Sequence, residues 1–400
     1  MNASARARLE PVARSAPATG SGLSAELAPA LTRALEWAGD EALAVVLSGS
    51  HARGEAVWAE VSGQRVSLSD LDVYAILRDE SACAAARERA RRSPWRPDGA
   101  VVAPLEVAFV TLDGLAAMSA RPGTVELARS GRVIAGDPGV LARLPGWPSA
   151  QVSAEERQLL LENRAFELLA AHDPEPGALG GLLARHALMK AALDAAAARL
   201  LALGEWPAGA AARVERAREL PAPGGLPSWL EGAWAGGEPL WREALAWRMP
   251  GALATLGAAA TAERRAAVRL WCVAWWEGTA FAAASDPWER AVRVAARGSW
   301  ARRLRRAWAF RARTGATPAL AQRLRHALAG TPALRVHGSA AVLLLAAAQS
   351  PHEPRLPAGA LHALHRLGVT RATAFDAAVR DTFAAWDQQL HDGLRTRSRV

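Results

Sequence analysis

Two short stretches of this chain combine glycine, serine and paired acidic residues in a spacing suited to phosphate chemistry. Asp70 and Asp72 stand two positions apart in a predicted strand, so both carboxylates should leave the same face, about 7 Å apart. Such like charges repel unless a cation lies between them, and hard carboxylate oxygens suit Mg²⁺. Gly49 and Ser50 follow an apolar run and predict a strand-turn-helix whose amides and hydroxyl can hold a phosphate. The chemistry indicated is metal-assisted phosphoryl or nucleotidyl transfer.

A third carboxylate strengthens this hypothesis. Glu106 lies in the segment 104–110, whose other residues are almost all apolar. A lone ionised glutamate inside such a strand is costly unless it is paired or bound to metal, so we expect it to face Asp70 and Asp72. There it would complete a two-metal site or take a proton from the acceptor.

A mixed α/β unit that ends near residue 149 is predicted to position these groups, and helices follow it. Ser153 and Glu156 form a capping box that opens a helix, and Gly204 ends a second long one. Strands are expected at 43–47, 71–77, 101–111 and a hairpin at 57–66, with helices at 24–38, 81–92, 178–203, 261–284, 287–313, 318–329 and 373–390. The expected fold class is α+β: a flexible tail (1–22), a small mixed-sheet domain (23–150), an all-helical domain (151–250) and a basic, Trp- and Arg-rich helical extension (251–400).

Composition excludes several classes of protein. With 51% hydrophobic and 22% charged residues in 400, the chain is neither disordered nor fibrous. Its two cysteines, Cys83 and Cys272, exclude a disulfide framework and fit a reducing compartment. The longest apolar run, 339–349, is shorter than the roughly 20 residues a membrane span needs. We therefore expect a cytoplasmic protein with no membrane partner.

The positive charge is concentrated at one end of the sequence. The net charge is +9, yet residues 1–152 sum to −1 and residues 153–250 to −3, which leaves +13 in residues 251–400. Seven arginines between Arg297 and Arg313 exceed a typical solvated helix face, so this run is a candidate site for an anionic partner. Ten of the sixteen tryptophans fall between Trp229 and Trp308; packing between Ala-rich helices is the favoured interpretation, and base stacking the alternative.

The motifs together resemble the polymerase β-like nucleotidyltransferase superfamily, especially its minimal and aminoglycoside-modifying members. The resemblance covers roughly residues 25–150 and rests on 45–56 (VVLSGSHARGEA), 69–73 (SDLDV), the strand glutamate Glu106 and the Gly-Asp-Pro at 136–138. One departure is that 19 residues separate Ser50 from Asp70, about twice the usual number; the predicted hairpin accounts for the excess.

The resemblance implies roles for particular residues. Gly49 and Ser50 would hold the triphosphate, and Asp70, Asp72 and Glu106 would bind Mg²⁺, with two ions expected. The segment 186–194 is similar to the helical substrate domain of several such transferases, in which a basic residue reaches the triphosphate across the cleft. Lys190, the chain's only lysine, is the candidate; an i,i+4 ion pair with Asp194 is the alternative.

Several other residues have two possible interpretations each. Arg53 is a candidate phosphate contact together with His51, although both also fit a solvated basic turn, and Glu55 fits local capping or pairing. Glu162 and Glu167 would be either a base from the helical domain or its solvated face. A second Gly-Ser at 338–339 lacks a following acidic pair and is interpreted as a helix start.

The function expected is Mg²⁺-dependent transfer of a nucleoside monophosphate, AMP from ATP, to a hydroxyl of an unidentified, small-molecule acceptor, with release of pyrophosphate. One alternative directs the same chemistry at a protein or tRNA, as in toxin-antitoxin pairs. Another is a non-catalytic protein whose basic C-terminal region binds nucleic acid.

Overall fold

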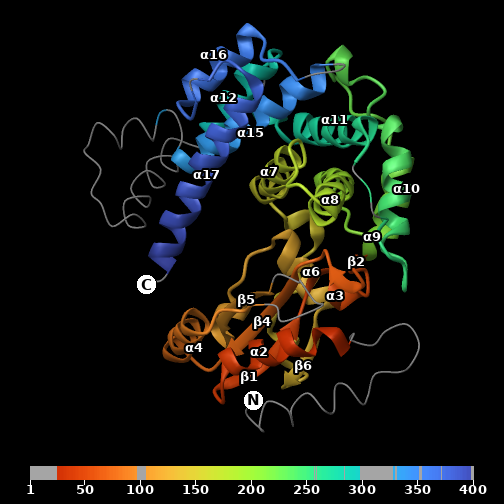
Figure 1. The fold of residues 1–400 in the computed structure, drawn as a ribbon. Helices are drawn as coiled ribbons and strands as arrows, with labels where there is room; N and C mark the ends of the chain where they lie inside the picture. Colours follow the sequence, from red (N-terminus) through yellow and green to blue (C-terminus); the bar gives the residue numbers. More distant parts are fainter. Residues whose placement is uncertain are drawn as a thin grey trace.

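A small mixed sheet near the N-terminus is followed by a much larger group of helices (Figure 1). The computed structural model describes residues 25–96, 105–255, 257, 259–282, 284–297, 328, 331–350, 354–370 and 372–397. The predicted tail, the arginines from 302 to 313 and nearly all of the helix predicted at 318–329 lie outside these residues. The α+β class expected from the sequence is confirmed. We call residues 25–150 the α/β domain and residues 151–397 the helical domain.

The sheet of the α/β domain has four strands in the order β5-β4-β1-β6. Strand β1 pairs antiparallel with both β4 and β6, and β4 pairs parallel with β5. The two central strands read as nearly continuous apolar runs because helices cover both faces of the sheet. The strands are β1 (Ala42–Leu47), β4 (Leu71–Leu77), β5 (Leu105–Thr111) and β6 (Arg132–Gly136).

Alternate strand residues enter separate cores on the two faces of this sheet. Val45 and Val73 pack under α2 (Ala28–Ala38) and α4 (Glu80–Arg92). Val46 and Ile76 pack on the opposite face, which α5 (Leu112–Ala116) and α6 (Pro122–Ser130) cover. The predicted strands and helices of this domain are therefore present, with bounds that differ from the expected ones by a few residues.

The excess chain between Ser50 and Asp70 forms the predicted hairpin, β2 (Trp58–Val61) and β3 (Gln64–Ser67). Ser62 and Gly63 both have positive φ, 53° and 75°, which suits the twist of a two-residue hairpin turn. The hairpin packs into the core of the helical domain, and the Ala254 amide donates to the Trp58 carbonyl at 2.7 Å. The insertion thus joins the two domains.

The helical domain is built around one hydrophobic core that includes buried residues from Leu161 to Val379. This core passes through residue 250, the expected boundary between the all-helical domain and the basic extension. Ser153 caps the first helix, since its hydroxyl accepts the Glu156 amide at 3.2 Å. The helices are α7 (Ala154–Ala170), α8 (Ala178–Ala202), α9 (Gly209–Glu219), α10 (Glu238–Ala246), α11 (Thr261–Gly278), α12 (Pro287–Ala295), α15 (Pro332–Gln349), α16 (Ala358–Leu367) and α17 (Phe375–Arg397). None of the helices in the described ranges is long and apolar enough to cross a membrane.

Tryptophan side chains fill this core, as the packing interpretation predicts. Trp241, Trp271 and Trp275 are fully buried, and the last two stack with ring centroids 5.9 Å apart on α11. The interpretation of Gly338-Ser339 as a helix start is wrong, because both residues lie inside α15. A Cβ at Gly338 would lie 3.1 Å from side-chain atoms of Ala295 and Leu367, so glycine allows these elements to pack closely.

Arg297 does not belong to an exposed basic surface, which corrects its place in the predicted anion-binding run. The helix predicted at 287–313 ends at Ala295, and the Arg297 side chain, 6% exposed, forms a two-point ion pair with Glu162, 3% exposed. Each buried charge needs its partner, because an unpaired charge in the core is costly. Glu162 is accordingly part of the core and not of a solvated face.

Candidate active site

The turn after β1 contacts the second aspartate directly. The Ser48 amide donates to the Asp72 carbonyl at 2.9 Å, which holds the end of β1 beside β4. Gly49 then adopts φ 68° at the start of α3 (Gly49–Arg53). A Cβ at Gly49 would lie 2.4 Å from Asp72 Oδ2, so only glycine allows the turn to approach the carboxylate this closely. Ser50 follows it and is partly exposed.

Three acidic residues lie at the end of the sheet nearest this turn. Asp70 immediately precedes β4, and Asp72 pairs in register with Glu106 on the parallel strand β5. Burial, together with the negative charges of Asp70 and Glu106, raises the pKa of Asp72 to about 6. The expectation that Glu106 faces the aspartates is consistent with this register and charge coupling. Because β5 is an edge strand and Glu106 is exposed, the cost of placing an ionised glutamate inside an apolar strand, from which its metal role was inferred, does not apply.

Carboxylates of this kind can bind a divalent cation, although their side chains do not already surround a metal position. In the described ranges, no three His, Cys, Asp or Glu side chains already stand as a metal-holding group. The pKa of Asp72 is nevertheless raised, first by burial and then by the negative charges of Asp70 and Glu106. Carboxylate oxygens are the ligands Mg²⁺ prefers, and this ion usually completes its shell with water and substrate phosphates. Asp70 and Asp72 would hold it, with Glu106 adjacent.

The helical domain brings its own cation to this site. Lys190 on α8 places Nζ 3.2 Å from Asp70 Oδ2 and 3.8 Å from Glu167 Oε1 on α7. The alternative ion pair of Lys190 with Asp194 is not the contact formed; Asp194 pairs with Arg164 Nε at 2.7 Å. Lys190 therefore bridges the two domains at the acidic cluster. Glu167, partly exposed, stands beside it and is not simply a solvated face residue.

The Arg53 guanidinium donates hydrogen bonds to two carboxylates. Its Nε donates to Glu55 at 2.7 Å, and its Nη1 donates to Glu126 on α6. Glu126 also accepts from Arg213 and, at 3.1 Å, from the Trp206 indole of the helical domain. Arg53 therefore fixes α3 against α6 and, through Glu126, against the helical domain. Glu126 was missed in the sequence because α6 carries no local sign that two arginines converge on it.

Glu55 links α3 to the helical domain directly. Its carboxylate accepts from the Ala210 amide at the start of α9 at 2.8 Å, and its carbonyl accepts from Arg248 at 2.9 Å. Local pairing of Glu55 was expected, whereas docking onto the helical domain was not. The turn that carries Gly49 and Ser50 is thus fixed from one side by the sheet and from the other by α9.

His51 is a buried structural residue, which corrects both alternatives considered for it. Its side chain is 6% exposed, with Nε2 3.1 Å from Ser67 Oγ and 3.2 Å from the Ser69 carbonyl. Burial lowers its pKa, so the neutral form is favoured. His51 therefore ties the turn to the hairpin and to the residue before Asp70.

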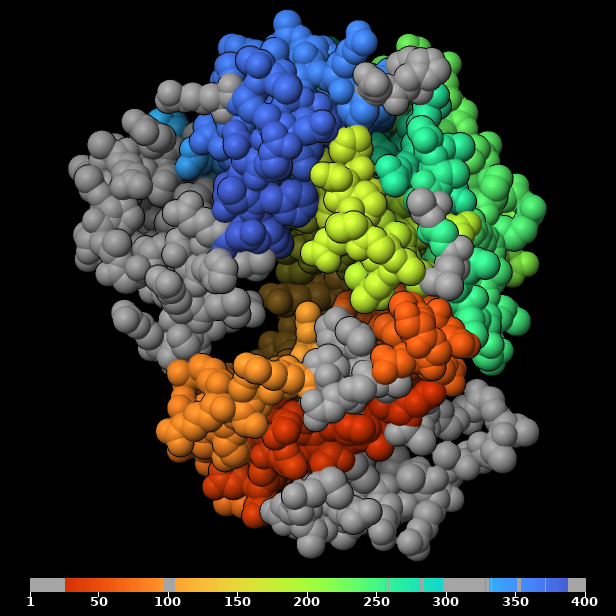
Figure 2. All heavy atoms as spheres, viewed as in Figure 1, coloured from red at the N-terminus to blue at the C-terminus, as the bar shows by residue number. Residues whose placement is uncertain are grey.

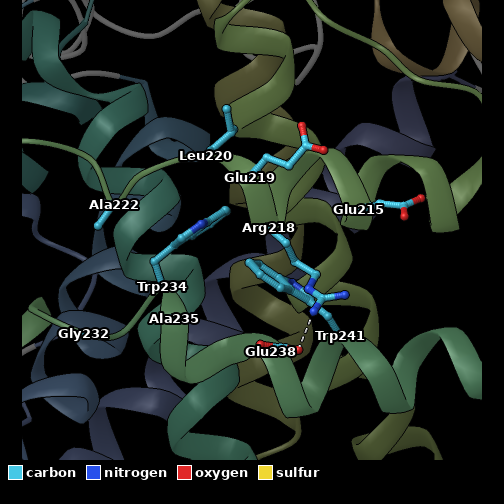
Figure 3. Close-up of a pocket in the computed structure, with 10 residues that line it drawn as sticks. All are labelled: Glu215, Arg218, Glu219, Leu220, Ala222, Gly232, Trp234, Ala235, Glu238 and Trp241. Atoms are coloured by element: carbon cyan, nitrogen blue, oxygen red, sulfur yellow. Dashed lines mark hydrogen bonds and ion pairs between the residues drawn. The ribbon is translucent and has the colours of Figure 1, made fainter.

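A cavity of about 480 Å³ lies on another part of the helical domain, between α9 and α10 (Figure 3). Its base is formed by Trp234 and Trp241, whose indole N–H groups are already bonded to Ala217 and Ala192 carbonyls. Across it Arg218 donates to Glu238 at 2.7 Å. The lining includes none of the candidate catalytic or nucleotide-binding residues, so the cavity is separate from the Asp70–Lys190 site.

The two domains are stacked, and the surface is recessed where the red and orange α/β domain meets the helices above it (Figure 2). The structure brings together Gly49, Asp70, Asp72 and Lys190 and places Glu106 beside Asp72. Arg53 pairs with Glu55 and Glu126, and its charge also acts on Asp72. Comparison of the chain with protein-family models, with curated proteins and with solved structures found no match.

Proposed function

We propose that this protein is a nucleotidyltransferase of the polymerase β-like type that uses Mg²⁺ to move AMP from ATP to a hydroxyl of a small-molecule acceptor. The observation that carries the proposal is the meeting of Gly49, the Asp70–Asp72 pair and Lys190 at one point between two domains. A glycine turn, paired carboxylates and a lysine from a second domain are the groups that a nucleoside triphosphate and its metal require.

Each residue has a defined part in this proposal. Asp70 and Asp72 hold the metal, which when bound neutralises phosphate charge and polarises the α-phosphate. Gly49 lets the phosphates approach the carboxylates closely, and the Ser50 hydroxyl donates to a phosphate oxygen. Lys190 binds the leaving pyrophosphate and offsets its charge.

The acceptor is activated from the edge of the sheet. Glu106 is exposed on β5 beside Asp72, so an acceptor hydroxyl can reach it and lose its proton there. The acceptor oxygen then forms a bond to the α-phosphorus while the bond to the bridging oxygen of pyrophosphate breaks. Arg53 holds α3 in place through Glu55 and Glu126, and its charge lies close enough to Asp72 to lower the pKa of that carboxyl group.

The test is direct labelling. The purified full chain is incubated with Mg²⁺, a metabolite extract and each NTP labelled at the α-phosphate, and the labelled product is identified by mass. ATP-dependent labelling of a small molecule, abolished in the Asp70→Asn/Asp72→Asn double variant, is the expected result. Label on protein or tRNA would move the acceptor to that class. Absence of label together with salt-sensitive RNA binding would favour the non-catalytic alternative.

A further inference from the structure

Lys190 occupies the place of a cation at the acidic cluster. Its ammonium contacts Asp70 Oδ2 at 3.2 Å, and the two side chains remain 24% and 39% exposed. Lys190 also lowers the pKa of the neighbouring Asp72. Asp70, which is proposed to bind the metal, is therefore already neutralised by Lys190 from the helical domain.

Lys190 is also the cation best able to leave this position. The backbone around it is fixed, because Met189 and Ala191 are buried in the helical core. The lysine side chain itself is a flexible stem with a compact charge. By contrast, Arg164 is held by Asp194 and Glu167, and Arg53 is held by Glu55 and Glu126. Of these three cations, Lys190 is the one with an ion pair to Asp70, which is partly exposed.

We propose that Lys190 makes this site selective for a metal–nucleotide complex over the free metal ion. Without nucleotide its ammonium competes with a divalent cation for Asp70. A nucleotide phosphate offers the ammonium a stronger anionic partner, so Lys190 moves to the phosphate and Asp70 becomes available to the metal. This specificity role rests on the proposed function, since it requires a triphosphate bound between Lys190 and the acidic cluster.

Thermodynamic linkage makes the consequence measurable. Because the nucleotide removes the competitor of the metal, metal and nucleotide tighten each other's binding by the same factor. Replacement of Lys190 by an uncharged residue removes both the competitor and a repulsive charge. Free metal should then bind about tenfold more tightly, whereas the metal–nucleotide complex should bind about tenfold more weakly.

The experiment titrates Mn²⁺ into the full-length protein and counts free ion by electron paramagnetic resonance, with and without the non-hydrolysable α,β-methylene ATP. Lys190→Met should tighten binding of Mn²⁺ alone and lose most of the enhancement by nucleotide. Lys190→Arg restores a competing cation and should again bind free Mn²⁺ weakly. Arg242→Met, which removes a charge of the same sign from the 76%-exposed Arg242 on α10, should match wild type.

Equal or weaker binding of free Mn²⁺ by Lys190→Met would overturn the selectivity role. If wild type still transferred nucleotide in that case, the proposed function would stand without it. Failure of every variant to bind Mn²⁺, even with the analogue present, would overturn both. Circular dichroism of each variant confirms that the fold is intact before titration.

Discussion

Asp72→Asn should stabilise the metal-free protein while abolishing its proposed activity. The pKa of Asp72 is raised from 3.8 to about 6 by burial and by the charges of Asp70 and Glu106, which is equivalent to about 3 kcal/mol. A carboxyl group whose pKa is higher in the fold than in the unfolded chain favours folding at low pH. That contribution is lost as the pH rises through about 6. Asparagine cannot ionise and avoids the loss.

The size of the effect can be worked out for a melting experiment. An unfolding entropy of about 2.1 cal/mol/K per residue gives about 0.8 kcal/mol/K for 400 residues. The full effect therefore corresponds to a rise in Tm of about 3 to 4 °C at pH 8. Differential scanning calorimetry in EDTA at pH 8 and pH 5 measures it, and the gain of the variant should shrink at pH 5. An equal Tm at pH 8, or a gain that does not depend on pH, would refute the reasoning.

The remaining predictions concern the turn and the buried ion pair. Gly49→Ala should lower nucleotide transfer about a hundredfold, because the new Cβ would lie 2.4 Å from Asp72 Oδ2. Gly63→Ala is the matched control: its φ of 75° imposes similar backbone strain in open space, so stability falls and transfer persists. Arg297→Met should cost about 3 to 5 kcal/mol in urea unfolding because it leaves the buried Glu162 with only the more distant His337, at 3.9 Å. The double variant Arg297→Met/Glu162→Leu should lose much less unfolding free energy, because no charge is left buried. A loss as large as that of Arg297→Met alone would contradict this explanation.

Local patterns predicted most of the α/β domain. The apolar runs before Ser48 and after Asp70 are strands because both sheet faces are covered, and Ser153 begins a helix through the expected cap. The predicted hairpin is present because Ser62 and Gly63 accept positive φ. These features depend on neighbouring residues in the sequence, so the sequence alone contains the needed information.

Contacts between distant segments could not be predicted in this way. The apolar strand around Glu106 suggested that its charge needs a partner or a metal, yet the strand order makes β5 an exposed edge. Arg53 meets Glu126, and Arg297 meets Glu162, across separations of 73 and 135 residues. Charge counts along the chain cannot reveal such pairs, since pairing depends on how the helices dock. Family resemblance suggested only that Lys190 reaches the triphosphate; its contact with Asp70 could be found only from the geometry.

The central claim is tested most directly by following the two ends of the triphosphate. ATP labelled separately at the α- and γ-phosphates is incubated with the protein, Mg²⁺ and a metabolite extract. We expect the α-label in the acceptor and the γ-label in pyrophosphate. The Asp70→Asn/Asp72→Asn variant should form neither labelled product. Label from the γ-phosphate in the acceptor, or unchanged α-labelling by the double variant, would contradict it.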